Sequence, residues 1–326
     1  MNGKTTLCCL GMALSISGGA HAASSAWKPD KAVEIIVNTA PGASPDRNAR
    51  LMQKIFQERK LIEVPITVSN RVGGGGAVAY TYLNGRPGDA HMVAIASKLI
   101  LASHIMGRGP HHVDFTPLAH LFGEYSVIGV RPDSPIKTGR EVVERLKKDP
   151  GALTIGIATS LGNVSHQAIA DPLKEAGIDL KKTKVVVFQA STLAITAMLG
   201  GHVDLVPMVP GTAHPLVQSG QVRLLAITAP KRATGLLANV PTWREQGYDT
   251  VVSNWRSVIA PKGLTAPQIA YWERTLRELV QTDEWKLNLE RSHAESEFLG
   301  SAETRKLMDA DYVKLKEFLT ELELVK

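Results

Sequence analysis

The feature that most constrains the fold is a regular alternation of short apolar runs with stretches of helical periodicity. Between the apolar runs lie segments with apolar residues three and four apart, such as residues 47–59, 165–176 and 193–199. Strands that alternate with helices at this spacing form βαβ units around a largely parallel sheet. The sequence therefore predicts an α/β protein, with strands at residues 33–38, 62–69, 92–97, 125–130, 153–158, 184–188, 202–207 and 222–228.

The length of the chain divides this pattern into more than one unit. At ~150 residues per domain, 326 residues correspond to about two domains. A second series of strands begins near residue 125, and the chain ends in two helical stretches, residues 265–290 and 302–322. We expect two α/β units, with the helical end packed on one of them.

Residues 1–22 have the pattern of a secretory signal peptide. Lys4 provides a basic start, residues 7–16 are apolar, and Ala20-His21-Ala22 is a small-residue cleavage site. The alternative, a membrane helix, needs ~18 or more apolar residues, and this run is shorter. We expect cleavage after Ala22, which removes both cysteines and leaves a periplasmic protein without disulfides.

The net charge of +6 is scattered in short clusters. A nucleic-acid interface needs a continuous basic stripe with stacking aromatic residues, and only 5% of the residues are aromatic. We expect no nucleic-acid partner, and only mild electrostatic attraction of anionic ligands.

Residues 70–79, NRVGGGGAVA, contain the most distinctive motif. Residues 74–79 match the dinucleotide pattern G-x-G-x-x-A, but that motif also needs an acid after the next strand, where Ser97 and Lys98 stand instead. The glycines still expose backbone N–H groups at the N-terminus of a helix, and such groups favour binding of an anion. The turn at residues 41–44 is built similarly, and both turns lie at the carboxyl edge of the predicted sheet. Plain tight turns are the alternative.

Two kinds of chemistry compete with anion binding. Residues 158–162 form an A-x-S-x-G variant of the nucleophile elbow, which would make Ser160 the nucleophile of a periplasmic serine hydrolase. His166 is too close in sequence for the usual order of such triads. His111, His112 and Asp114 could bind a metal, but there is no H-E-x-x-H motif, so we expect surface histidines and neither metal nor cofactor.

Several blocks of the sequence together resemble the Bug or TctC-like family of extracytoplasmic solute receptors, which serve tripartite tricarboxylate transporters. The resemblance covers nearly the whole mature chain. Its blocks, in order, are residues 41–50 (PGASPDRNAR), 70–76 (NRVGGGG), 161–166 (LGNVSH), 200–204 (GGHVD), 225–232, 240–248 and 255–261.

The resemblance implies a type II periplasmic-binding-protein fold with two α/β lobes and two hinge crossings, near residues 124–130 and 251–259. Residues 23–125 and 251–326 would form the first lobe and residues 126–250 the second. Such a receptor would not be an enzyme; it would be a monomer that closes on a small carboxylate and delivers it to membrane transporter subunits. A sensor that presents its closed form to a membrane signalling partner would have the same sequence features.

The family's loops carry over onto a set of expected ligand-binding residues. Their departures from the family pattern, at Thr39, Ala43, residues 158–160 and residues 189–192, point either to a specificity away from the common dicarboxylates or to a loss of binding. The expected residues are Pro41, Gly42, Ala43, Ser44, Asp46, Gly74, Gly75, Gly76, Ala77, Ser97, Thr159, Ser160, Gly162, Asn163, His166, Gln189, Ala190, Ser191 and Asp204.

Overall fold

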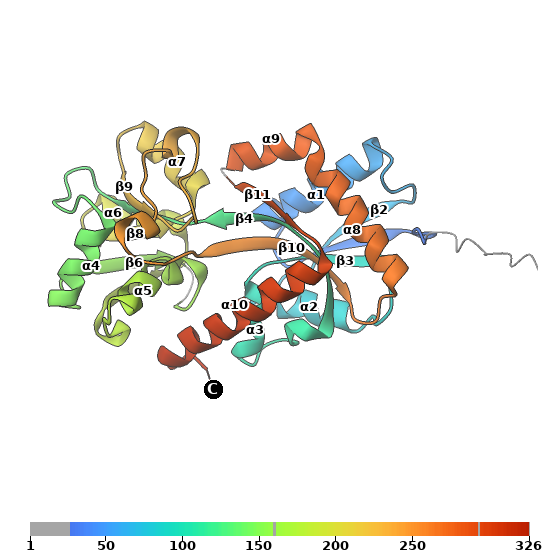
Figure 1. Ribbon diagram of the computed structural model, residues 1–326, viewed down its shortest axis with the longest axis horizontal. Helices are drawn as coiled ribbons and strands as arrows, with labels where there is room; N and C mark the ends of the chain where they lie inside the picture. The colour runs from blue at the N-terminus through green and yellow to red at the C-terminus, as the bar shows by residue number, and fades with distance from the viewer. Residues whose placement is uncertain (1–26, 159–160, 293, 326) are drawn as a thin grey trace, which may run out of the picture.

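The computed structural model describes residues 27–158, 161–292 and 294–325, and the predicted signal peptide lies outside this range. Two separate sheets organise the chain (Figure 1). The first has six strands in the order β11-β4-β10-β3-β1-β2. Its strands are β1 (Val33–Val37), β2 (Ile66–Asn70), β3 (Met92–Ala96), β4 (Phe115–Tyr125), β10 (Ser253–Pro261) and β11 (Glu295–Leu299).

The second sheet has five strands in the order β7-β6-β8-β5-β9. We call the unit around the six-stranded sheet the first lobe and the unit around this sheet the second lobe. The strands of the second lobe are β5 (Val127–Val130), β6 (Thr154–Ala158), β7 (Lys184–Phe188), β8 (Leu205–Met208) and β9 (Arg223–Ile227).

Both sheets are mixed, so the prediction of largely parallel sheets holds only for part of each. β1 is parallel to β2 and β3, and β6 is parallel to β7 and β8. The antiparallel pairs in the first lobe are β10 with β3, β10 with β4 and β11 with β4. In the second lobe, β5 is antiparallel to both β8 and β9. The reason is that β4 and β10 carry the chain to the second lobe and back, and therefore run in opposite directions.

The helices surround the two sheets as the hydrophobic periodicity predicts, but several elements, among them β4, β11, α3 and α7, were not expected. In the first lobe the helices are α1 (Ser44–Glu58), α2 (Ala77–Asn84), α3 (Leu99–Ile105), α8 (Ala266–Gln281) and α9 (Asp283–Ser292). In the second lobe they are α4 (Gly139–Lys148), α5 (Val164–Glu175), α6 (Ser191–Leu199) and α7 (Pro210–Gln218).

The predicted helix over residues 265–290 is wrong, because it is two helices. Thr282 has extended backbone angles (φ −70°, ψ 146°), and α9 begins at the next residue. The hydroxyl of Thr282 accepts a hydrogen bond from the N–H of Trp285 at 3.4 Å, as an N-cap residue does. A capping residue therefore overrides the continuous apolar stripe.

The last helix, α10 (Ser301–Glu321), contacts both lobes (Figure 1). Near its start, Arg305 donates hydrogen bonds to backbone carbonyls of the first lobe, at His112 and Phe115. Near its end, Phe318 packs edge-to-face on His166 of the second lobe, with ring centroids 5.4 Å apart. Lys174 pairs with Glu321 at 2.6 Å. Because α10 joins both lobes, the assignment of residues 251–326 to the first lobe stays a prediction.

Candidate ligand cleft

A cavity of about 350 Å³ lies between the two lobes, within the size range of small-molecule sites. The first lobe, β10, the second lobe and α10 all contribute to its wall. The lining residues are Asn38, Thr39, Pro45, Ser97, Lys98, Leu99, Ala102, Met106, Leu161, Gly162, Asn163, Val164, Ser165, Gln167, Asn254, Arg256, Leu315 and Leu319.

The parallel strands explain why these segments meet. Asn38 and Thr39 directly follow β1, Ser97 and Lys98 directly follow β3, and Leu161 lies shortly after β6. The carboxyl ends of parallel strands in each lobe therefore face the cavity, which is where ligands bind in open α/β sheets.

Two cationic side chains line the described part of the cavity wall, and each already has an anionic partner. The Arg256 guanidinium lies 2.7 Å from the Glu124 carboxylate, and both are buried or nearly so. Lys98 Nζ lies 3.2 Å from Asp311 Oδ2, which also accepts a hydrogen bond from Trp255 Nε1 at 2.8 Å. Each of the two cations is therefore neutralised by a carboxylate, and the two ion pairs together add no net charge to the cleft.

Three buried side-chain atoms on the cavity wall have no hydrogen-bond partner in the described part of the chain. They are Thr39 Oγ1, Gln167 Oε1 and Arg256 Nε. A buried polar atom without a partner costs about 1–3 kcal/mol. All three atoms are buried in this conformation, so a polar ligand group or a water molecule would reach them after the neighbouring side chains or the lobes move.

The start of α5 forms part of the cavity wall and is capped by Asn163. Its Oδ1 accepts from the N–H of His166 at 2.9 Å, and its Nδ2 donates to the carbonyl of Ala158 at 2.5 Å. This arrangement holds the first turn of α5 with its positive dipole end toward the cavity.

His166 supports this loop from behind the wall. Its Nδ1 accepts a hydrogen bond from the N–H of Gly162 at 3.0 Å. Burial lowers the pKa of His166 to about 4, so the ring is neutral at neutral pH and can accept that bond. His166 positions the loop and does not itself line the cavity.

Asp46 has a similar supporting role in the first lobe. Its carboxylate accepts from the N–H of Gly42 at 2.7 Å, from Arg50 Nε at 3.0 Å and from Asn70 Nδ2 at 2.9 Å. Burial alone would raise the pKa of Asp46, but the hydrogen bonds from Arg50, Gly42 and Asn70 outweigh it and lower the pKa. Asp46 therefore ties the turn at residues 41–44 to the end of β2.

The glycine run lies directly behind the cavity wall. Gly73, Gly74, Gly75 and Gly76 all have positive φ, between 57° and 135°, a region that favours glycine. A Cβ on Gly76 would lie 2.9 Å from the Tyr80 ring and 3.0 Å from the amide nitrogen of Asn38. The run therefore allows close packing behind a residue of the cavity wall, while Gly74 and Gly75 remain exposed.

Comparison with known proteins decides the family. A model of the tripartite tricarboxylate transporter family receptor, TctC, matches residues 49–324. The chain belongs to this family. It is also 27% identical over 290 residues to protein BugT of Bordetella pertussis, a match that covers 86% of each chain.

Solved structures support the same fold for this TctC-family receptor. A TctC solute-binding protein from Polaromonas has a TM-score of 0.80 at 21% identity, with 90% of this chain and 99% of that chain covered. An R. palustris protein with adipate has a TM-score of 0.71 at 22% identity, covering 90% and 97%. The predicted two-lobe type II fold is therefore confirmed.

The receptor brings only three of the expected ligand-binding residues to the cavity wall: Ser97, Gly162 and Asn163. Asp46 and His166 support neighbouring loops, and Thr159 and Ser160 lie outside the described residues. Eleven others are absent from the wall of this cavity: Pro41, Gly42, Ala43, Ser44, Gly74, Gly75, Gly76, Ala77, Gln189, Ala190 and Ser191.

Asp204 lies at the opposite edge of the sheet. It precedes β8, and its Oδ2 accepts a hydrogen bond from the N–H of Thr154 at the start of β6 at 2.7 Å. The cavity instead faces the carboxyl ends of the parallel strands. We therefore assign Asp204 a role in strand pairing and leave it out of the proposed site.

Sequence reasoning missed most of the polar wall of this receptor. Asn38 ends the predicted strand at residues 33–38 and Lys98 follows the predicted strand at residues 92–97, so their positions could have indicated them. Thr39 differs from the family pattern, which was a signal for this position. Arg256 had a weaker signal, because it adjoins Trp255 of a family block. The sequence contained no signal for Leu315 and Leu319, because the apolar periodicity of a helix does not show which part of the protein that face contacts.

The histidines near the start of β4 form a ring cluster of their own. The rings of His104 and His111 lie 4.2 Å apart, and those of His111 and Tyr312 lie 4.7 Å apart. His112 Nε2 lies 2.8 Å from Asp309 Oδ1. Within the described residues, no three His, Cys, Asp or Glu side chains are arranged to hold a metal ion, and no helix is sufficiently long and apolar for a membrane span.

Proposed function

We propose that this protein is a periplasmic receptor that captures a small carboxylate between its two lobes. It would act as a monomer and deliver the ligand to the membrane subunits of a tripartite tricarboxylate-type transporter. The observation that carries the proposal is the cavity between the lobes, whose wall includes Arg256 and Thr39; each of these residues has one buried donor without a partner in the described part of the chain.

The energetics of such a site are adequate for capture. Micromolar binding needs about −8 kcal/mol. Hydrogen bonds to a charged group contribute about 1.5–3 kcal/mol each, and the dipole at the start of α5 adds up to about 2 kcal/mol in a buried geometry. Burial of apolar ligand surface when the lobes close supplies the remainder.

The family and one solved relative support a carboxylate as ligand. The chain belongs to a family of transporter receptors, and the R. palustris protein with the same fold holds adipate. We therefore place the carboxylate of the ligand against Arg256 and Thr39, with the cavity around it closed by movement of the lobes.

A thermal-shift panel tests the proposal. Mono-, di- and tricarboxylates are added separately, each with its methyl ester as control. A carboxylate at about 100 times its dissociation constant should stabilise the folded protein by about 2.7 kcal/mol. Acids must raise the melting temperature and esters must not. Equal shifts from acids and esters would show that the site does not recognise a carboxylate.

We also propose that the receptor carries out no reaction on its ligand. The competing hypothesis, a serine hydrolase using Ser160, predicts turnover of nitrophenyl esters that is lost in Ser160→Ala. We expect the same background rate for both proteins. Turnover by the wild type that disappears in the variant would favour the hydrolase.

A further inference from the structure

We infer that the receptor prefers a monocarboxylate with an apolar body over a dicarboxylate of the same length. This inference rests on the proposed function, because it assumes that the cavity between the lobes holds a carboxylate. It goes further by assigning one anionic end and one apolar end to the ligand.

The apolar side of the cavity carries the first part of the argument. Leu99 from the first lobe and Leu161 from the second lobe both line the cavity and are 37% and 39% exposed. Met106 of the first lobe adds a third apolar side chain to the wall. Exposed leucines that face one cavity from both lobes would be removed from water if the lobes closed on an apolar group.

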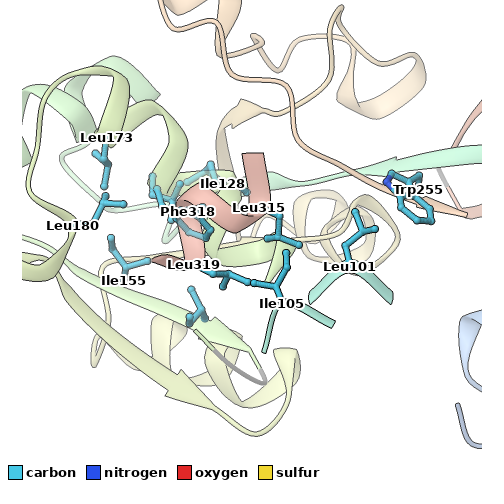
Figure 2. Packing of buried hydrophobic residues seen from close by; sticks show 14 of the residues in the cluster. Leu101, Ile105, Ile128, Ile155, Leu173, Leu180, Trp255, Leu315, Phe318 and Leu319 are labelled. Carbon is cyan, nitrogen blue, oxygen red and sulfur yellow. The ribbon is translucent and has the colours of Figure 1, made fainter. Parts of the chain in front are cut away.

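The last helix extends this apolar side. Leu315 and Leu319 of α10 line the cavity and belong to a buried cluster that spans both lobes (Figure 2). Figure 2 shows Leu315 and Leu319 close to Ile105. Because α10 touches both lobes, it gives the cavity a fixed hydrophobic wall beside the two exposed leucines.

The charges of the cavity carry the second part of the argument. Arg256 and Lys98 are the charged residues of the described wall, and Glu124 and Asp311 already neutralise them at 2.7 and 3.2 Å. When movement of the lobes exposes these two buried atoms, one carboxylate can use the Nε–H of Arg256 together with the Thr39 hydroxyl. A second carboxylate would find no unpaired cation on this wall, and a buried charge without a partner is costly.

The third free polar atom of the wall fits the same ligand. Gln167 Oε1 is a hydrogen-bond acceptor, so it can accept from a hydroxyl, an amide or water, and this atom offers no hydrogen bond to a second carboxylate. The cavity thus has one place for an anion and a wall of leucine and methionine side chains for the rest of the ligand.

Matched pairs of acids test the inference by calorimetric titration of the full mature protein. Each pair has equal chain length: butyrate with succinate, hexanoate with adipate, octanoate with suberate, and benzoate with terephthalate. We expect the monoacid of at least one pair to bind about tenfold or more tightly than its diacid. Tighter binding of the diacids, or no binding of any monoacid, would overturn the inference.

The alcohols of the same chain lengths separate this inference from the proposed function. If hexanol binds as tightly as hexanoate, the site does not recognise a carboxylate and the proposed function fails. If diacids bind and alcohols do not, the proposed function stands and only the preference for an apolar body fails.

Two variants place the apolar end of the ligand. Leu99→Asn and Leu161→Asn change exposed side chains of the cavity wall, so the fold should tolerate them. Each should weaken hexanoate binding by about threefold to tenfold and weaken adipate binding less. Leu287→Asn is the matched control, because Leu287 is 45% exposed on α9 and does not line the cavity. Equal losses in all three variants would contradict the assignment.

Discussion

His166 shows how one residue supports the cleft without touching the ligand. Its folded pKa of about 4 lies below its ordinary value of 6.5, because the ring is buried. The unfolded chain therefore binds a proton that the folded chain excludes, so stability is present above pH 6.5 and falls as the pH drops toward 4. The loss can reach roughly 3 kcal/mol.

His166→Gln tests this role by urea unfolding at pH 7.5 and near pH 4.5. Glutamine can still accept from Gly162 but does not titrate, so the variant should lose less stability in acid than the wild type. Burial raises the pKa of Asp171 to about 6, and this carboxyl acts in the opposite direction in both proteins. Parallel acid losses in wild type and variant would show that His166 is not responsible.

Only some residues of the candidate site could be predicted from the sequence. The resemblance to the family implied Ser97, Gly162 and Asn163, in agreement with the rule that ligands bind at the carboxyl edge of a parallel sheet. It could not separate ligand contacts from loop supports such as Asp46 and His166. That distinction depends on where each side chain finds its hydrogen-bond partner, which only the folded chain decides.

Among the elements, α10 packs tightly against a loop of the cleft. A Cβ on Gly162 would lie 2.3 Å from Leu319 Cδ2, and Gly162 has a φ of +78°. Gly162→Ala should therefore be destabilising through both backbone strain, about 1–2 kcal/mol, and overpacking, about 1–3 kcal/mol. Chemical denaturation measures the sum.

Gly177→Ala is the matched control for this contact. Gly177 has nearly the same φ, +77°, and a Cβ there would meet no atom within 4 Å. It should show only the strain, and Leu319→Ala added to Gly162→Ala should relieve the overpacking. Equal losses for the two glycine variants would mean that α10 does not press on the loop in solution.

Helices and strands were predicted well where the hydrophobic periodicity and the capping residues agreed. They were predicted poorly where contacts between distant parts of the chain determine the structure. Strands β1, β3, β6 and β7 follow from their apolar runs. The break at Thr282 and the short strand β11 depend on a cap and on pairing with β4, respectively. The reach of α10 across both lobes depends on packing between residues far apart in sequence, so its amphipathic pattern alone could not reveal it.

At the scale of the whole molecule, β4, β10 and α10 all bridge the two lobes. Lys174–Glu321 and Lys181–Glu323, at 2.6 and 2.5 Å, are surface ion pairs that hold the end of α10 to the second lobe. Such exposed pairs contribute about 0–1 kcal/mol each, so the buried packing of Phe318 and Leu319 against the second lobe holds α10 more firmly than they do. Closure on a ligand would therefore need movement around β4 and β10 together with adjustment of this packing.

Small-angle X-ray scattering tests closure directly. Addition of a carboxylate that raises the melting temperature should lower the radius of gyration, because the lobes approach each other around the bound ligand. The methyl ester of the same acid is the control and should leave the scattering unchanged. Identical curves with acid, ester and no ligand would contradict closure.

The most direct measurement of the central claim, that the cavity between the lobes holds a carboxylate, is calorimetric titration of Thr39→Val. The ligand is whichever acid stabilises the wild type most. Thr39 Oγ1 is buried without a partner, so valine should leave the free energy of unfolding unchanged or raise it slightly. Loss of its hydrogen bond to the carboxylate should weaken binding by about tenfold or more. Wild-type affinity in a folded Thr39→Val protein would contradict the account.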